Sequence, residues 1–194
     1  MMQLLPMMMY CFVMSITPGP NNMMLTASGA NFGYRRTLPQ ILGIHAGGIV
    51  LSLVCCAGLG RLFVEWPALQ STLRVAGAIY LVYLAFKLAR ARVGEASVLR
   101  PQSFAEGALF QAINPKSWIK AVTLASVFMP AGMPPLLAGA LIATVGTVVG
   151  FPCISVWALF GVAIRGFLQD ARKQRVFNLL MAVTLLVLAV EFLR

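Results

Sequence analysis

Two short polar stretches interrupt long apolar runs, and their side chains could bind a small charged ligand. Amides and hydroxyls both donate and accept hydrogen bonds, and a lysine ammonium donates three. Such groups suit a ligand that carries one carboxylate and one ammonium. The candidate binding residues are Thr17, Pro18, Gly19, Pro20, Asn21 and Asn22 in the first stretch, and Asn114, Pro115, Lys116 and Ser117 in the second.

The prolines of these stretches predict two broken helices. A proline inside a helix removes a backbone N–H, and its ring clashes with the carbonyl four residues earlier. Each stretch should therefore be an unwound turn that joins two half-helices. Because lipid cannot satisfy the freed backbone groups, such breaks face protein or a polar cavity. Broken helices are typical of transporter binding sites, although a kink that only shapes the bundle is the alternative.

Lys116 and Lys120 lie one helical turn apart, so they share a face of the expected helix. A charge at mid-membrane is costly and marks a functional site by default. We expect Lys116 to bind a substrate carboxylate and Lys120 to matter less. The competing interpretation is that both lysines snorkel to the membrane surface.

His45 is the only histidine of the chain. Its ordinary pKa lies near neutrality, which makes it a candidate for proton coupling. A packed, hydrogen-bonded histidine is the competing interpretation. No Asp occurs in any apolar run, and no acidic residue is expected at mid-membrane.

The composition indicates an all-α integral membrane protein with one domain, residues 1–194. Hydrophobic residues make up 60% of the chain and charged residues 10%, whereas a soluble domain carries about 25% charged residues. The lipid bilayer is therefore one expected partner. The net charge of +10 does not indicate nucleic acid, because the basic residues cluster between apolar runs. Six spans are expected, at 4–28, 38–60, 68–87, 104–129, 136–162 and 176–193.

The two proline breaks also predict an inverted repeat of three plus three helices, with helices 1 and 4 broken. Pro115 lies 97 residues after Pro18, and 97 is half of 194. The halves are about 1–97 and 98–194, joined by a solvated basic linker from Lys87 to Gln102. Three spans per half give the halves opposite orientations, with the substrate site at their interface.

The loop charges predict that both termini face outwards. The first, third and fifth connections hold ten Lys and Arg residues, whereas the other connections and the ends hold two, Arg61 and Arg194. Basic loops stay in the cytoplasm.

Small residues predict close helix packing at two places. Gly43 and Gly47 are four residues apart, as are Gly146 and Gly150. Such spacing lets helix backbones approach one another.

The four cysteines, Cys11, Cys55, Cys56 and Cys153, all lie in apolar runs and are interpreted as packing residues. A membrane thiol-redox carrier is an alternative function, and a non-transporting membrane scaffold is another. The sequence holds no hydrolase, zinc-protease or phosphate-loop motif. The chain is therefore not expected to be an enzyme, nor to need a metal or other cofactor.

The chain resembles the LysE/RhtB family of amino-acid exporters over nearly its whole length. The resemblance is carried by Thr17 to Asn21, Gly33-Tyr34-Arg35-Arg36, Gly43-Ile44 with Gly47, Gly77 to Lys87, and Asn114-Pro115-Lys116. Within the family, the chain most resembles the cysteine/O-acetylserine exporter branch. That resemblance is carried by Pro18-Gly19-Pro20-Asn21-Asn22 with Ser28, by Asn31-Phe32-Gly33, and by Cys153 with Trp157-Ala158-Leu159.

The resemblance implies efflux of a small amino acid or derivative across the bacterial inner membrane, driven by the proton gradient. The implied partner is thus a small-molecule amino-acid substrate. Assembly into a homo-oligomer is a further partner that the sequence leaves open.

Overall fold

The computed structural model describes residues 4–90 and 100–193, which form helices joined by short connections. The helices are α1 Leu4–Ile16, α2 Pro20–Phe32, α3 Tyr34–Val54, α4 Gly60–Glu65, α5 Pro67–Ala89, α6 Phe104–Ile113, α7 Pro115–Val127, α8 Pro135–Ala163 and α9 Ala171–Leu193. A π-helical turn, Cys55–Leu59, and a 3₁₀ turn, Phe167–Gln169, complete them. The described residues contain no strand, so the predicted all-α class is confirmed.

Both predicted helix breaks are present. Residues 17–19 separate α1 from α2, and Asn114 alone separates α6 from α7. Each second half-helix begins with a proline, the position where the missing N–H costs nothing. The Asn114 side chain accepts a hydrogen bond from the Lys116 backbone N–H at 3.1 Å and so caps α7.

Within the described residues, four continuous helices are long and apolar enough to cross a membrane. They are Tyr34–Leu59, Pro67–Ala89, Pro135–Ala163 and Ala171–Leu193, and they match the second, third, fifth and sixth predicted spans. The first and fourth predicted spans correspond to the half-helix pairs. Large apolar side chains cover the outer surface; Ile79 on α5 and Leu180 on α9, for example, are 65% and 58% exposed. Such a surface suits contact with lipid.

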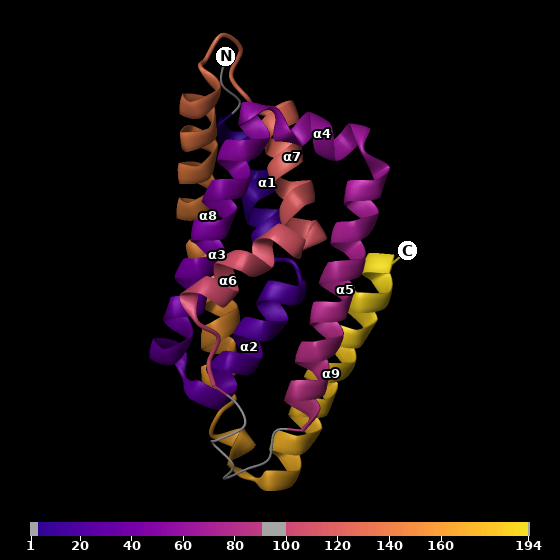
Figure 1. The fold of residues 1–194 in the computed structure, drawn as a ribbon. Coiled ribbons are helices and arrows are strands. Elements are labelled where there is room, and N and C mark those ends of the chain that lie inside the picture. The colour runs from indigo at the N-terminus through magenta and orange to yellow at the C-terminus, as the bar shows by residue number, and fades with distance from the viewer. Residues whose placement is uncertain (1–3, 91–99, 194) are drawn as a thin grey trace.

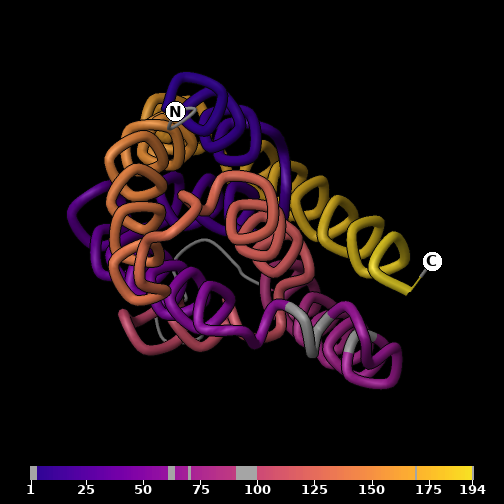
Figure 2. Tube along the Cα trace, turned by 90° about the horizontal axis from the view of Figure 1, so that it is seen from above, coloured from indigo at the N-terminus to yellow at the C-terminus, as the bar shows by residue number. Residues whose placement is uncertain are grey.

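The bundle has two parts (Figure 1). Helices α1, α2, α3, α6, α7 and α8 form one group, while α5 and α9 pack along each other beside it. Seen from above, this pair projects from one side of the group (Figure 2). The α3 segment bends at its upper end, where Gly58 has φ 117°, and α4 then crosses the top of the molecule. A φ in that range favours glycine.

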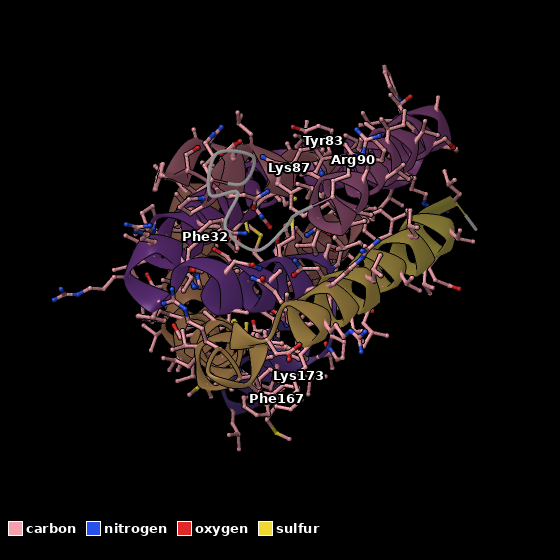
Figure 3. The ribbon with its side chains drawn as sticks, turned by 90° about the horizontal axis from the view of Figure 1, so that it is seen from below. Phe32, Tyr83, Lys87, Arg90, Phe167 and Lys173 are labelled. Carbon is pink, nitrogen blue, oxygen red and sulfur yellow. The ribbon has the colours of Figure 1, made fainter. Side chains whose placement is uncertain are left out.

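The two broken helices run in opposite directions. In Figure 1, α1 descends to the centre and α2 continues to the lower end, whereas α6 lies in the middle and α7 rises to the top. Basic side chains gather at the lower end, which Figure 3 shows with Lys87, Arg90 and Lys173 labelled. The predicted solvated linker between Lys87 and Gln102 lies largely in 91–99, outside the described residues.

Glycines allow some of these helices to touch. A Cβ on Gly43 would lie 2.1 Å from the Phe104 carbonyl oxygen, and one on Gly47 would lie 2.4 Å from that of Ala108, so this predicted packing face is confirmed. The second predicted face holds at Gly150, where a Cβ would lie 3.2 Å from the Ser15 hydroxyl, but not at Gly146. Gly146 has open space around it, because this part of α8 borders a cavity rather than a helix.

Candidate substrate site

The two helix breaks meet, and Lys116 connects them. Its Nζ atom donates hydrogen bonds to the Thr17 carbonyl at 3.0 Å, the Thr17 hydroxyl at 2.9 Å and the Pro18 carbonyl at 3.1 Å. These oxygens follow directly after the last residue of α1. Gly19 leaves room for this contact, because a Cβ there would lie 3.0 Å from Nζ.

An amide pair forms a second link between the breaks. Asn21 donates to Gln111 at 3.0 Å, and Gln111 donates back to Asn21 at 3.2 Å. The Ser117 hydroxyl donates to the same Gln111 oxygen at 2.6 Å. Gln111 is buried, so these three hydrogen bonds hold α2, α6 and α7 in one arrangement.

Side chains also satisfy the carbonyls that end the first half-helices. Asn22 donates to the carbonyls of Ser15 at 2.9 Å and Thr17 at 2.8 Å. The indole of Trp157, on α8, donates to the Ile16 carbonyl at 3.1 Å. At the second break, the Trp118 indole donates to the Ala112 carbonyl at 2.7 Å. The breaks are therefore hydrogen-bonded structures, as buried backbone groups require.

A cavity of about 100 Å³ opens between the two breaks, α3 and α8. Eight of the eleven predicted site residues line it, namely Gly19, Pro20, Asn21, Asn22, His45, Asn114, Lys116 and Ser117. Thr17 and Pro18 do not line the cavity themselves, but both accept hydrogen bonds from Lys116, which does. Pro115 is the first residue of α7 and does not line the cavity.

Lys120 is the second cation of the cavity wall. Its Nζ atom donates to the Ser15 hydroxyl at 3.0 Å. Both lysines thus turn towards the end of α1. No Asp or Glu among the described residues lines the cavity. Two cations without a lining carboxylate suit an anionic group of a ligand.

His45 lines the cavity and has one unpaired polar atom. Its Nε2 is buried and has no hydrogen-bond partner among the described residues, and its ring lies 5.6 Å from that of Phe151. Gly150 leaves space here, since a Cβ would lie 3.2 Å from both the His45 ring and the Ser15 hydroxyl.

Sequence reasoning missed several residues of the cavity wall. Gln111 belongs to the second polar stretch but was not expected in the site, and Ser15 lies one residue before the end of α1. Further wall residues that were not expected are Gly48, Ser52, Gly146 and Thr147. The polarity of Gln111 inside an apolar run was the available signal.

Lipid-facing helices around a polar cavity between two helix breaks define a membrane transporter of the broken-helix class. Comparison with known proteins agrees: the LysE type translocator family matches residues 12–194. The chain belongs to the LysE type translocator family, and it is a transporter rather than an enzyme.

The chain is similar to curated bacterial efflux proteins. It is 30% identical over 190 residues to the cysteine/O-acetylserine efflux proteins of Escherichia coli (strain K12) and Shigella sonnei (strain Ss046). The match covers 94% of this chain and 93% of each relative. No solved structure matches the chain.

Proposed function

We propose that the protein is a secondary exporter of a small amino acid or derivative in the bacterial inner membrane, driven by the proton gradient. Cysteine and O-acetylserine are the first candidate substrates, because the curated relatives carry those names. One observation supports the proposal most: the cavity between the two breaks has two lysines and four amide side chains on its wall, and no Asp or Glu of the described residues lines it.

Lys120 and the start of α2 are the best placed groups for the substrate carboxylate. Lys120 donates one hydrogen bond to Ser15, and its ammonium carries three protons. The first residues of α2, Pro20 to Asn22, line the same cavity. The first N–H groups of a helix lack intrahelical partners and carry positive partial charge, which attracts carboxylates.

The cavity size supports a small substrate. On this measure about 10–15 Å³ holds one water molecule, so a cavity of about 100 Å³ admits a ligand of several heavy atoms. Ile44, Ala143 and Ile154 supply apolar wall for a short side chain.

An inverted repeat, the predicted 3+3 arrangement, is supported by the packing. Helix α3 of the first half packs against both α6 and α7, and its counterpart α8 packs against both α1 and α2. Each broken helix thus contacts the unbroken helix of the other half, and the cavity lies at this interface.

Efflux from vesicles tests the proposal. Purified protein in proteoliposomes should release labelled O-acetylserine or cysteine faster than empty vesicles, with a panel of other labelled amino acids as comparison. A variant with all four cysteines replaced by alanine should keep this activity, whereas a thiol-redox carrier would lose its function. Release no faster than from empty vesicles, for every amino acid, would leave the scaffold alternative.

His45 and Lys116 are two groups on the cavity wall that could carry the coupling proton. His45→Gln in the same vesicles tests the histidine. If His45 carries the proton, this variant should lose dependence on the pH gradient while it still binds substrate.

A further inference from the structure

We propose that the oxygens at the end of α1 form a cation site, which the Lys116 ammonium and the substrate ammonium occupy in turn, so that Lys116 carries the coupling proton. The proposal rests on the proposed function, since it needs an amino-acid substrate. It assigns to Lys116 a different role from carboxylate binding.

The oxygens form a complete site for an ammonium. An ammonium has three protons, and Lys116 Nζ has three oxygen acceptors within 3.1 Å. The Thr17 hydroxyl gives its own proton to the Val13 carbonyl at 2.8 Å, so its oxygen faces Lys116 as an acceptor. The carbonyl end of a half-helix carries negative partial charge, which favours a cation.

The same oxygens would suit the ammonium of an amino acid. They contact Lys116 on the cavity wall, which lies one helical turn of α7 from Lys120, the proposed carboxylate partner. However, Lys116 occupies all three of them in this structure. A substrate ammonium can therefore bind there only after Lys116 has moved away, and a neutral amine leaves more easily than a cation.

The other titratable groups nearby do not offer an equivalent arrangement. Among the described residues, Lys120 on α7 and His45 on α3 line the cavity with Lys116. Cys11 on α1 and Cys153 on α8 interact electrostatically with Lys120. No carboxylate of the described residues lines the cavity to share a proton. Lys120 places a second positive charge on the same face of α7 as Lys116.

The resulting cycle balances one proton against one substrate. In the cytoplasm-facing state, the Lys116 ammonium gives a proton to water, and the substrate ammonium takes the oxygens. In the outward-facing state the substrate leaves, and the amine of Lys116 takes a proton from external water and returns to the oxygens. One proton enters the cell for each amino acid exported.

Two measurements on proteoliposomes test the proposal. The first is exchange of labelled for unlabelled O-acetylserine at equal pH on both sides. The second is accumulation of labelled O-acetylserine driven by a pH gradient that is acidic inside. Lys116→Met should keep exchange within about threefold of wild type and lose at least tenfold of the accumulation. Lys116→Arg should lose both, because a guanidinium does not release its proton.

Matched variants separate this role from others. Lys120→Met should raise the half-saturating substrate concentration of exchange and of accumulation alike, whereas His45→Gln should keep the dependence on the pH gradient. Gly166→Ala, outside the cavity, should change neither measurement. If Lys116→Met is not recovered as folded protein, Gly19→Ala replaces it in both measurements. The added Cβ would push the Lys116 amine away from the oxygens. Accumulation by Gly19→Ala should then fall relative to exchange.

Two results would overturn the proposal. One is accumulation that persists in Lys116→Met, whether or not His45→Gln loses it. The other is exchange and accumulation lost together in folded Lys116→Met. In each of them the wild type transports. A wild type that shows neither exchange nor accumulation would instead contradict the proposed function itself.

Discussion

Lys116 and Lys120 look equivalent in the sequence but have different surroundings in the structure. Three oxygens of the first break surround the Lys116 amine, whereas Lys120 has one hydroxyl partner, Ser15, among the described residues. A lysine with all its protons satisfied holds two helices together, and one with spare protons can bind a ligand. This difference decides which lysine we assign to the carboxylate.

Thr17 offers a test at the scale of one atom. Thr17→Val removes the hydroxyl acceptor of Lys116 but keeps the shape of the side chain. A hydrogen bond to a charged group contributes about 1.5–3 kcal/mol, so gradient-driven transport should fall about tenfold or more. Thr17→Ser keeps the hydroxyl and should transport within about twofold of wild type. Equal rates for the two variants, at matched membrane abundance, would exclude a role for this oxygen.

The amide pair of Asn21 and Gln111 predicts a measurable coupling between the breaks. Each residue donates to the other, so the effects of Asn21→Ala and Gln111→Ala on thermal stability in detergent should not add. A double-mutant cycle should give an interaction of about 0.5–1.5 kcal/mol. Asn31→Ala with Gln111→Ala is the control, since Asn31 bonds to Ala27 and Gln174 instead. Additive effects in the first pair would show that the link does not hold the breaks together.

Residue types alone could predict many residues of the candidate site but not which of them form hydrogen bonds with one another. Prolines mark the two breaks, although Pro39 and Pro152 lie inside continuous helices. Polar residues next to the breaks, such as Asn22 and Asn114, were expected in the site and line the cavity. Gln111 was not predicted as a site residue, because its role depends on a hydrogen bond to Asn21, which lies 90 residues away in the sequence. Which oxygens a lysine reaches is likewise a matter of tertiary geometry.

At the scale of elements, glycine spacing predicts close packing only where a helix lies opposite. The pair Gly43 and Gly47 packs on the α6 backbone, whereas Gly146 borders the cavity. The closest contact of α2 and α8 uses two glycines far apart in sequence: a Cβ on Gly29 would lie 2.1 Å from the Ala158 carbonyl oxygen, and one on Gly161 would lie 2.1 Å from that of Thr26.

This contact predicts strong effects of one added methyl group. Gly29→Ala or Gly161→Ala should force α2 away from α8, because both contacts are with backbone atoms. Overpacking costs about 1–3 kcal/mol, which corresponds to a melting temperature in detergent lower by roughly 5 °C. Gly166→Ala is the matched control, since its Cβ would meet nothing within 4 Å. Three equal melting temperatures would show that α2 and α8 do not pack this closely.

At the scale of the whole molecule, hydropathy and prolines predicted the helix inventory because both act locally. The joints at Pro67 and near Pro135 fall where helices begin. The bend at Gly58 and the short α4 were not predicted, because the apolar run continues through them. The pairing of α5 with α9 also depends on tertiary contacts that no local pattern reports.

The orientation of the molecule remains a prediction from charge. The ten-to-two distribution of basic residues between alternate connections places both termini outside. A tag at either end should react with a membrane-impermeant reagent from outside intact cells, and a cysteine introduced at Gly166 should not. A C-terminal tag that reacts only after the inner membrane is opened would reverse the assigned orientation and the direction of the cycle.

Substrate protection of the cavity tests the central claim, that the amino acid binds between the two breaks. Ser117→Cys is introduced into a chain whose four cysteines are alanine, and the rate of labelling by a small thiol reagent is measured in proteoliposomes. Saturating O-acetylserine should slow the labelling at least fivefold, and the modified protein should no longer transport. A cysteine at Gly166, outside the cavity, should be labelled at the same rate with or without substrate. Labelling of Ser117→Cys that O-acetylserine does not slow, in vesicles that still transport it, would place the substrate elsewhere and contradict the account.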